Sequence, residues 1–135
     1  MDILIDTSVW IDFFNQKKTV PEVRLAQELL AKEHNNICIC PLIYQEILQG
    51  IREEKIFADI KNILRNFSLL DIDIMTAADY AVDLYRYLRK KGITTRKSAD
   101  CLIAAYAIIS DVPLLHRDKD FNQIAKHSAL EVYTG

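Results

Sequence analysis

Residues 1–12 read MDILIDTSVWID, and this stretch decides how the rest of the chain is interpreted. Residues 3–5 form a continuous apolar run, which is typical of a strand that is buried on both faces of a parallel sheet. The run ends at Asp6, whose carboxylate is costly to bury unless a cation, a donor or water meets it. Thr7 and Ser8 follow and predict the cap of a short helix. Because open α/β sheets bind ligands beyond the carboxyl ends of their strands, Asp6 marks a candidate site.

The composition is that of an ordinary globular protein. The chain has 135 residues, of which 50% are hydrophobic and 27% charged, and its formal net charge is −2. This length predicts a single domain over residues 1–135. The net charge excludes a surface that is basic throughout, but it allows a local basic patch. Since there is no basic leader and no apolar run of membrane-spanning length, we expect a cytoplasmic protein without a membrane partner.

The number and spacing of the cysteines predict free thiols and no disulfide framework. There are three of them, Cys38, Cys40 and Cys101. An odd number cannot pair completely within one chain. A zinc site would need further ligands at suitable spacing, and His34, His116 and His127 do not supply them. We therefore expect the thiols to act as small buried hydrophobic groups.

Apolar periodicity predicts strands that alternate with helices. Beyond the first strand and its helix, we expect helices at 21–32, 41–50, 53–66, 76–91, 99–110 and 122–126, and strands at 37–40, 69–72, 113–115 and 131–133. Thr76 and Asp79 form a capping-box pattern, and Ser98 is expected to cap the helix after it. The alternation implies βαβ units with right-handed crossovers, and therefore an α/β fold with a mainly parallel sheet of four to five strands.

Acidic residues follow several of these strands. They are Asp6 after the first strand, Glu46 in the helix after the second, Asp100 at the start of a later helix, and Asp118 or Asp120 after the fourth strand. In a parallel sheet all of them come to one edge. Carboxylates this close raise each other's pKa, and a hard divalent cation is the usual remedy. Ligand sets made only of oxygen favour Mg²⁺ or Mn²⁺, which can hold a phosphodiester and lower the pKa of a bound water.

Each acid also has a purely structural explanation. Asp100 alone is explained by its place at a helix N-terminus, Asp118 or Asp120 by a turn or cap, and Glu46 by surface exposure. Asp6 is the hardest to explain in this way, because the apolar strand before it gives no reason for a charge. The remaining acids considered are expected at the surface, in turns or as caps: Asp2, Asp12, Asp59, Asp71, Asp73 and Asp83.

Four segments in order along the chain carry a resemblance to a known family. They are LIDTSVWI at 4–11, EILQG at 46–50, SADCLIAA at 98–105 and RDKDF at 117–121. These segments resemble the successive motifs of PIN-domain ribonucleases, specifically the VapC-type toxins of bacterial and archaeal toxin-antitoxin pairs. One such motif alone is weak, whereas four in the right order across nearly the whole chain are specific.

The resemblance implies a three-layer α/β/α sandwich. It also implies a magnesium- or manganese-dependent endoribonuclease that is inhibited by a cognate antitoxin and forms a homodimer. Asp6, Glu46 and Asp100 match the metal-binding acids of the family, and the fourth acid is either Asp118 or Asp120. Small hydroxyl positions that help to order the site are matched by Thr7, Ser8 and Ser98.

These observations lead to a hypothesis about the mechanism. Asp6 and Asp100 would hold the principal metal, while Glu46 and the fourth acid complete or support its water shell. A metal-activated water would attack the scissile phosphorus in line and leave a 5′-phosphate and a 3′-hydroxyl. No histidine is needed as a general base.

A dense basic run precedes Asp100. It consists of Arg86, Arg89, Lys90, Lys91, Arg96 and Lys97. The run could steer an RNA backbone toward the acids, and its plainer explanation is a solvated helix end. Trp10 and Phe14 on the first helix are candidates for a partner groove.

Three other classes of protein are weighed against this hypothesis. Haloacid-dehalogenase-like phosphatases need a second Asp two residues after the first, and Ser8 occupies that place. Receiver domains need adjacent acids at the first strand and a late Lys, which the acids here do not fit. The third alternative is a PIN-like scaffold that binds RNA or protein without cutting, but such proteins usually lack one or more acids that this chain retains.

Overall fold

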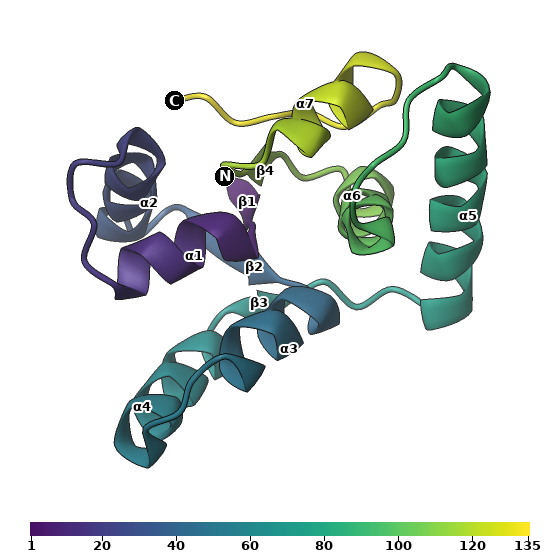
Figure 1. The fold of residues 1–135 in the computed structure, drawn as a ribbon. Helices are drawn as coiled ribbons and strands as arrows, with labels where there is room; N and C mark the ends of the chain where they lie inside the picture. The colour runs from purple at the N-terminus through teal and green to yellow at the C-terminus, as the bar shows by residue number, and fades with distance from the viewer.

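Figure 1 shows the fold in a computed structural model that describes residues 1–135. The elements in chain order are β1 (Asp2–Ile5), α1 (Thr7–Phe14), α2 (Pro21–Ala31), β2 (Asn36–Ile39), α3 (Pro41–Gln49), α4 (Glu54–Arg65), β3 (Ser68–Leu69), α5 (Ile74–Lys90), α6 (Ser98–Ser110), β4 (Leu114–Leu115) and α7 (Lys119–Lys126). None of these helices combines the length and the apolar character that crossing a membrane requires.

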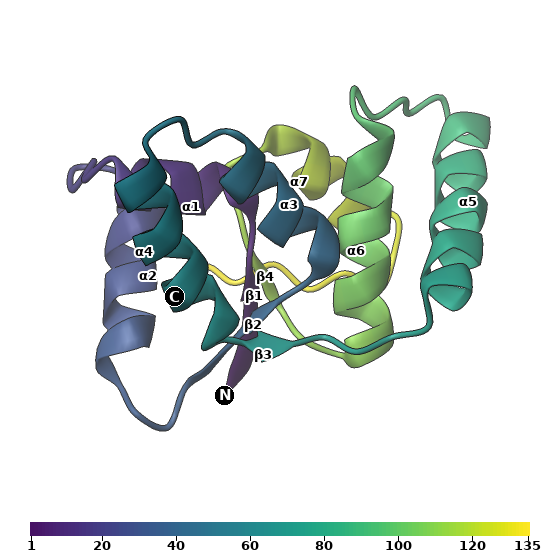
Figure 2. The ribbon, with the colours of Figure 1, turned by 90° about the horizontal axis from the view of Figure 1, so that it is seen from below.

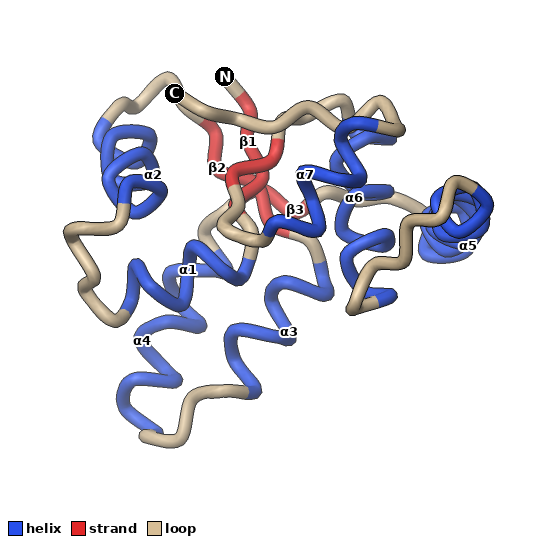
Figure 3. The backbone as a smooth tube through the Cα atoms, turned by 45° about the horizontal axis from the view of Figure 1, so that its top comes forward, coloured by secondary structure: helices blue, strands red, loops and turns tan.

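The strands form one four-stranded sheet in the order β3-β2-β1-β4, and every neighbouring pair is parallel. The strands gather in the middle of the molecule and helices surround them (Figure 3). Figure 2 shows α1, α2 and α4 on one side of the sheet and α5 and α6 on the other. This arrangement confirms the predicted three-layer α/β/α sandwich. The direction of strand order reverses beside β1, because β2 lies on one side of it and β4 on the other; ligands of α/β sheets bind at such a point.

The central strand β1 is buried as the sequence predicts. Ile3, Leu4 and Ile5 are fully buried and belong to a hydrophobic core of 32 residues. The N–H groups of Leu4 and Asp6 donate to the carbonyls of Pro113 and Leu115, both at 2.9 Å. These bonds hold the end of β1 against β4, so the loops that follow the two strands start side by side.

Trp10 is part of this core and not of a partner groove. Its ring is fully buried and stacks on Phe14 and Phe67, with ring centroids 5.5 and 5.2 Å apart. Burying so large an aromatic side chain stabilises the attachment of α1 to the sheet. The expectation of a partner-facing side chain is therefore wrong for Trp10.

Three predicted strands are shorter than expected, and β4 lacks only the predicted first residue, Pro113. The third strand is Ser68–Leu69, because its neighbour β2 ends at Ile39 and the last bond of the ladder runs from Leu70 N–H to the Ile39 carbonyl at 2.9 Å. Residues 131–133 form only an isolated parallel bridge, between Val132 and Leu114, because β4 itself has only two residues.

Helix starts also differ from the capping predictions. α5 begins two residues early because the carboxylate of Asp73, not Thr76, caps it and accepts the Thr76 N–H at 3.0 Å. α6 already includes Ser98, so Lys97 occupies the N-cap position and provides no capping bond. α7 begins at Lys119 instead of near residue 122, because Asp118 caps it.

Candidate metal centre

Asp6 begins the site at the carboxyl end of β1. It is the N-cap of α1, and its Oδ2 accepts the Ser8 N–H at 3.0 Å and the Ser8 hydroxyl at 2.6 Å. The predicted caps, Thr7 and Ser8, are thus inside the helix. The Ser8 hydroxyl oxygen also accepts the N–H of Arg117 at 3.0 Å. Ser8 therefore ties the acid after β1 to the turn after β4.

Three further acids converge at the N-termini of α6 and α7. Asp100, Asp118 and Asp120 each offer a carboxylate oxygen, and these oxygens lie within 4.8 Å of one another. Asp100 lies in the first turn of α6, Asp118 caps α7, and Asp120 lies in the first turn of α7. The alternative between Asp118 and Asp120 thus stays open, since the structure brings both to Asp100.

The electrostatic environment of this cluster disfavours the ionisation of all its carboxyl groups at once. Burial raises the pKa of Asp100 to about 7, and the carboxylates of Asp118, Asp6 and Asp120 act in the same direction. Burial also raises the pKa of Asp6, although the bonds from Ser8 oppose this effect. The effect of Asp6 on the pKa of Asp100 places the Asp6 carboxyl within electrostatic reach of Asp100.

The donor set fits a hard divalent cation. The Oδ2 atom of Asp100 is buried and has no hydrogen-bond partner. A buried carboxylate oxygen without a partner is costly, and a cation beside it removes the cost. The neighbouring ligand atoms are all carboxylate oxygens, which suit Mg²⁺ or Mn²⁺ better than zinc.

Arg96 supplies a positive charge at the same cluster. Its backbone N–H and its Nε both donate to Oδ2 of Asp120 at 3.2 Å, and its Nη2 donates to Oδ1 of Asp118 at 3.3 Å. These two acids raise the pKa of Arg96. Arg96 is therefore bonded to the acids, although its side chain is itself exposed. The other members of the predicted basic run are exposed at the end of α5 and before α6: Arg86, Arg89, Lys90, Lys91 and Lys97.

Glu46 lies at the border of the site. It comes from α3, and its Oε1 accepts the hydroxyl hydrogen of Thr7 at 2.8 Å. Neither Glu46 nor Asp6 belongs to the closest group of acids, which differs from the predicted principal pair of Asp6 and Asp100. Ser98, predicted to help order the site, is exposed at the start of α6.

Sequence reasoning missed His116 as part of this region. It directly follows β4, only 8% of its surface is exposed, and its Nδ1 accepts the Asp118 N–H at 3.1 Å. Burial lowers its pKa, while the charges of Asp6 and Asp118 act in the opposite direction. The signal was its position, because it follows an apolar strand at the same edge of the sheet as Asp6.

Asp12 is the second missed residue, and the expectation of a surface position is wrong. It is 7% exposed, forms an ion pair with Lys17 at 3.3 Å, and accepts a hydrogen bond from the Arg117 guanidinium. Arg117 also pairs with Glu22 at 3.3 Å. Helical spacing carries a signal for this burial, since Asp12 lies three residues after the buried Val9.

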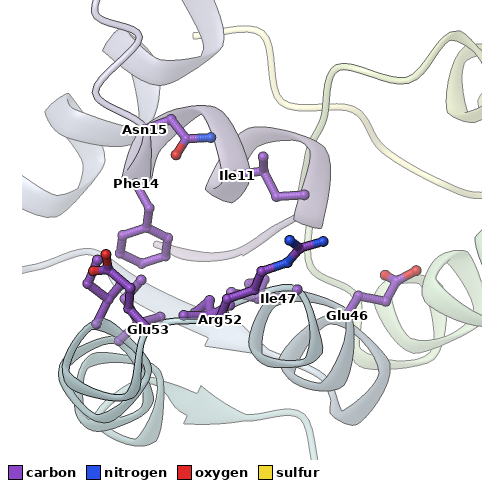
Figure 4. Close-up of a pocket in the computed structure, with 11 residues that line it drawn as sticks. Ile11, Phe14, Asn15, Glu46, Ile47, Arg52 and Glu53 are labelled. Carbon is purple, nitrogen blue, oxygen red and sulfur yellow. The ribbon is translucent and has the colours of Figure 1, made fainter.

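A groove of about 370 Å³ runs between α1 and the pair α3 and α4. Figure 4 shows Ile11 and Phe14 of α1 pointing toward α3 and the segment that follows it, with Arg52 rising between the helices. Ile11 is 48% exposed and Ile56, on the α4 side, is 45% exposed. Glu46 lines the edge of the groove. Because it also accepts the Thr7 hydroxyl, this side chain connects the groove to the residue that follows Asp6.

The chain is similar to a known protein family and to named ribonucleases. The family model described as PIN domain matches residues 3–127. Ribonuclease VapC11 of Mycobacterium tuberculosis is 34% identical over 129 residues, which cover 96% of each chain. Ribonuclease VapC1 of Methanocaldococcus jannaschii is 30% identical over 132 residues, which cover 97% of this chain and 86% of the relative.

Solved structures share the fold. VapBC2 from Rickettsia felis, bound to a DNA fragment from its promoter, matches with a TM-score of 0.73 and 21% identity over 98% of both chains. VapBC-1 from nontypeable Haemophilus influenzae matches with a TM-score of 0.73 and 17% identity over 98% of this chain and 97% of the other. The α/β/α arrangement thus extends over almost the entire length of each compared chain.

Proposed function

Because the chain belongs to the PIN domain family, we propose that it is a metal-dependent endoribonuclease and the toxin of a toxin-antitoxin pair. The observation that carries the proposal is the convergence of Asp100, Asp118 and Asp120, since Asp100 has a buried, unpartnered carboxylate oxygen and Asp6 is close enough to raise its pKa.

The proposed metal ligands are Asp6, Glu46, Asp100, Asp118 and Asp120, and the proposed ion is Mg²⁺ or Mn²⁺. Such an ion, when bound, lowers the pKa of a water and stabilises charge on a leaving oxygen. The chain itself supplies the orientation of the acids. Ser8 fixes one oxygen of Asp6, and the backbone N–H of Asp120 fixes one oxygen of Asp118.

The proposed substrate is RNA, held by its phosphates. The exposed cations at the end of α5 and before α6 lie next to the acids in the chain, and Lys97 is near enough to lower the pKa of Asp100. Their contact with a polyanion would weaken as salt rises. Measuring RNA affinity over a range of salt concentrations tests this assignment.

The proposed partner is an antitoxin that fills the groove between α1, α3 and α4. Exposed Ile11 and Ile56 provide an apolar surface, and Arg52 and Glu53 provide charges at its rim. Co-purification of the intact chain with a short protein encoded beside it tests this partner, and a chain that binds no such protein contradicts it.

We also propose a homodimer. The outer face of α5 leaves Ile74, Met75 and Val82 more than half exposed, which is unusual for three large apolar side chains of one helix. Light scattering of the purified protein measures the mass, and a monomer at micromolar concentration contradicts the dimer.

The decisive experiment is a cleavage assay on mixed RNA with Mg²⁺, with Mn²⁺ and with EDTA. We expect products only with metal, bearing a 5′-phosphate and a 3′-hydroxyl. Asp6→Asn and Asp100→Asn are expected to lower the rate by about 100-fold or more, since each removes a ligand charge. Asp59→Asn, on the exposed face of α4, serves as the matched control and should cleave at the wild-type rate.

Two results would contradict the proposal. Folded Asp6→Asn and Asp100→Asn variants that cut as fast as wild type would exclude these acids from the chemistry. RNA binding without metal-dependent products would favour the non-cutting scaffold.

A further inference from the structure

His116 is a buried imidazole that the proposed chemistry does not use. It directly follows β4, at the point where the strand order reverses. Its Nδ1 accepts the backbone N–H of Asp118 at 3.1 Å. An Nδ1 that accepts a hydrogen bond carries no proton, so the imidazole is neutral and its proton is on Nε2. The only hydrogen bond that the side chain makes is therefore with the backbone of Asp118, since its Nε2 has no partner.

The turn after β4 is held by a series of such bonds. The N–H of Arg117 donates to the Ser8 hydroxyl, and the N–H of Asp118 donates to His116. The Asp118 carboxylate then accepts the N–H of Asp120 at 3.0 Å through its Oδ1. The orientation of the Oδ2 atom of Asp118 thus depends on the hydrogen bond that its backbone N–H donates to His116.

The imidazole is itself held firmly. Its ring packs against the fully buried ring of Phe121, with centroids 5.1 Å apart. Because the His116 side chain is almost completely buried, water has little access to replace it as the acceptor. Removing the acceptor would leave the Asp118 N–H without this partner and free the start of the turn.

We propose that His116 is a positioning residue that orients the Asp118 carboxylate toward Asp100 through its Nδ1 acceptor. This inference rests on the proposed metal centre and assigns His116 a role in building it. The imidazole touches neither substrate nor metal in this assignment; it acts through the backbone of Asp118. The role requires an acceptor at the Nδ1 position and does not require an imidazole.

Two substitutions separate the acceptor from the bulk of the side chain. In His116→Asn the amide oxygen is as many bonds from the backbone as Nδ1 and can accept the same N–H. In His116→Leu the side chain has similar bulk and no acceptor. Both lose the ring contact with Phe121, so both should melt at a similar, lower temperature than wild type.

The measurement is Mn²⁺ affinity of the intact, RNA-free protein by calorimetry. We expect His116→Leu to bind Mn²⁺ about tenfold more weakly, as is typical when a group that orients a ligand is lost, and His116→Asn to stay within about threefold of wild type. His127→Leu, at the far end of α7, is the matched control and should bind as wild type does.

Equal Mn²⁺ affinities of His116→Asn and His116→Leu would overturn the inference, whether both match wild type or both are weak. A wild-type protein that binds no Mn²⁺ would overturn the metal centre as well. The two failures are distinguishable, because only the second removes metal binding from the unmodified chain.

Discussion

At Asp100, burial and the neighbouring carboxylates act in the same direction on one side chain. Its pKa rises to about 7 from an ordinary value of 3.8. The folded protein therefore holds a proton at Asp100 that the unfolded chain releases at lower pH. Between these two pKa values the folded state binds more protons, so stability falls as pH rises through this window. Ionisation of Asp100 thus lowers the stability of the folded state unless a cation binds beside it.

Asp100→Asn is expected to stabilise the protein in EDTA at about pH 8, by roughly 2 kcal/mol, because it removes this buried charge. At about pH 5 the gain should fall to less than half, since the wild-type carboxyl is then protonated in the folded state and only the ionisation of the unfolded chain still contributes. Urea unfolding at both pH values measures the difference. The exposed Asp83→Asn in α5 is the control, and an equal gain for Asp100→Asn at both pH values would contradict the argument.

At the scale of elements, the start of α6 conflicts with ordinary helix capping. Lys97 occupies its N-cap position in an extended conformation and makes no side-chain capping bond. A lysine there is unfavourable, because the N-terminus of a helix carries partial positive charge. By contrast, Arg89 and Lys90 in the last turn of α5 suit a helix C-terminus and need no functional explanation. Among these cations, Lys97 is thus the one whose placement helix capping does not explain, which supports its proposed contact with RNA.

Lys97→Ser should therefore stabilise the protein and weaken RNA binding. A serine N-cap is expected to add about 1 kcal/mol to the free energy of unfolding, and loss of one phosphate contact should lower the salt dependence of binding by about 0.7 in log-log slope. Filter binding in EDTA measures the affinity without cleavage. Glu53→Ser, at the uncapped N-terminus of α4, should stabilise without weakening RNA binding. Unchanged RNA affinity in Lys97→Ser would assign the lysine no role in binding.

The arrangement of the elements also explains how much of the site the sequence could predict. The sequence identifies Asp6 because the apolar run of β1 ends there. The parallel order of the strands then predicts that Asp100 and residues 118–120 lie at the same edge of the sheet. Local patterns carry a signal for the burial of Asp12 and His116, but they do not encode the contacts that these two side chains make. The Asp12 carboxylate meets Arg117 from a position 105 residues away, and His116 matters through the turn it anchors. The predicted cap at Thr76 is wrong because Asp73 caps α5. The predicted cap at Ser98 is wrong because α6 begins one residue earlier and includes Ser98.

At the scale of the whole molecule, the core encloses every thiol. Cys38, Cys40 and Cys101 are free, and at most 2% of each is exposed. Burial raises the pKa of all three, that of Cys40 to about 12. A buried thiol that stays protonated is a poor nucleophile. The sequence predicted this outcome, because two of the cysteines alternate with isoleucines in a strand.

Iodoacetamide is accordingly expected to leave the native protein unlabelled at about pH 8 and to modify all three cysteines in urea. Mass spectrometry counts the added groups, and the labelling rate at intermediate urea should follow the fraction of unfolded chain. Rapid labelling of any cysteine in the absence of urea would contradict the burial seen here.

Glu46 accepts the hydroxyl of Thr7, the residue after Asp6, and it also lines the edge of the groove beside α1. A partner bound in that groove would lie next to the proposed metal ligands. It could therefore inhibit cleavage directly, without a conformational change transmitted through the core. If the proposed metal centre and antitoxin groove are correct, a substitution at Glu46 should alter inhibitor recognition and turnover together. The two properties would then be coupled at this position, and neither could change there without the other.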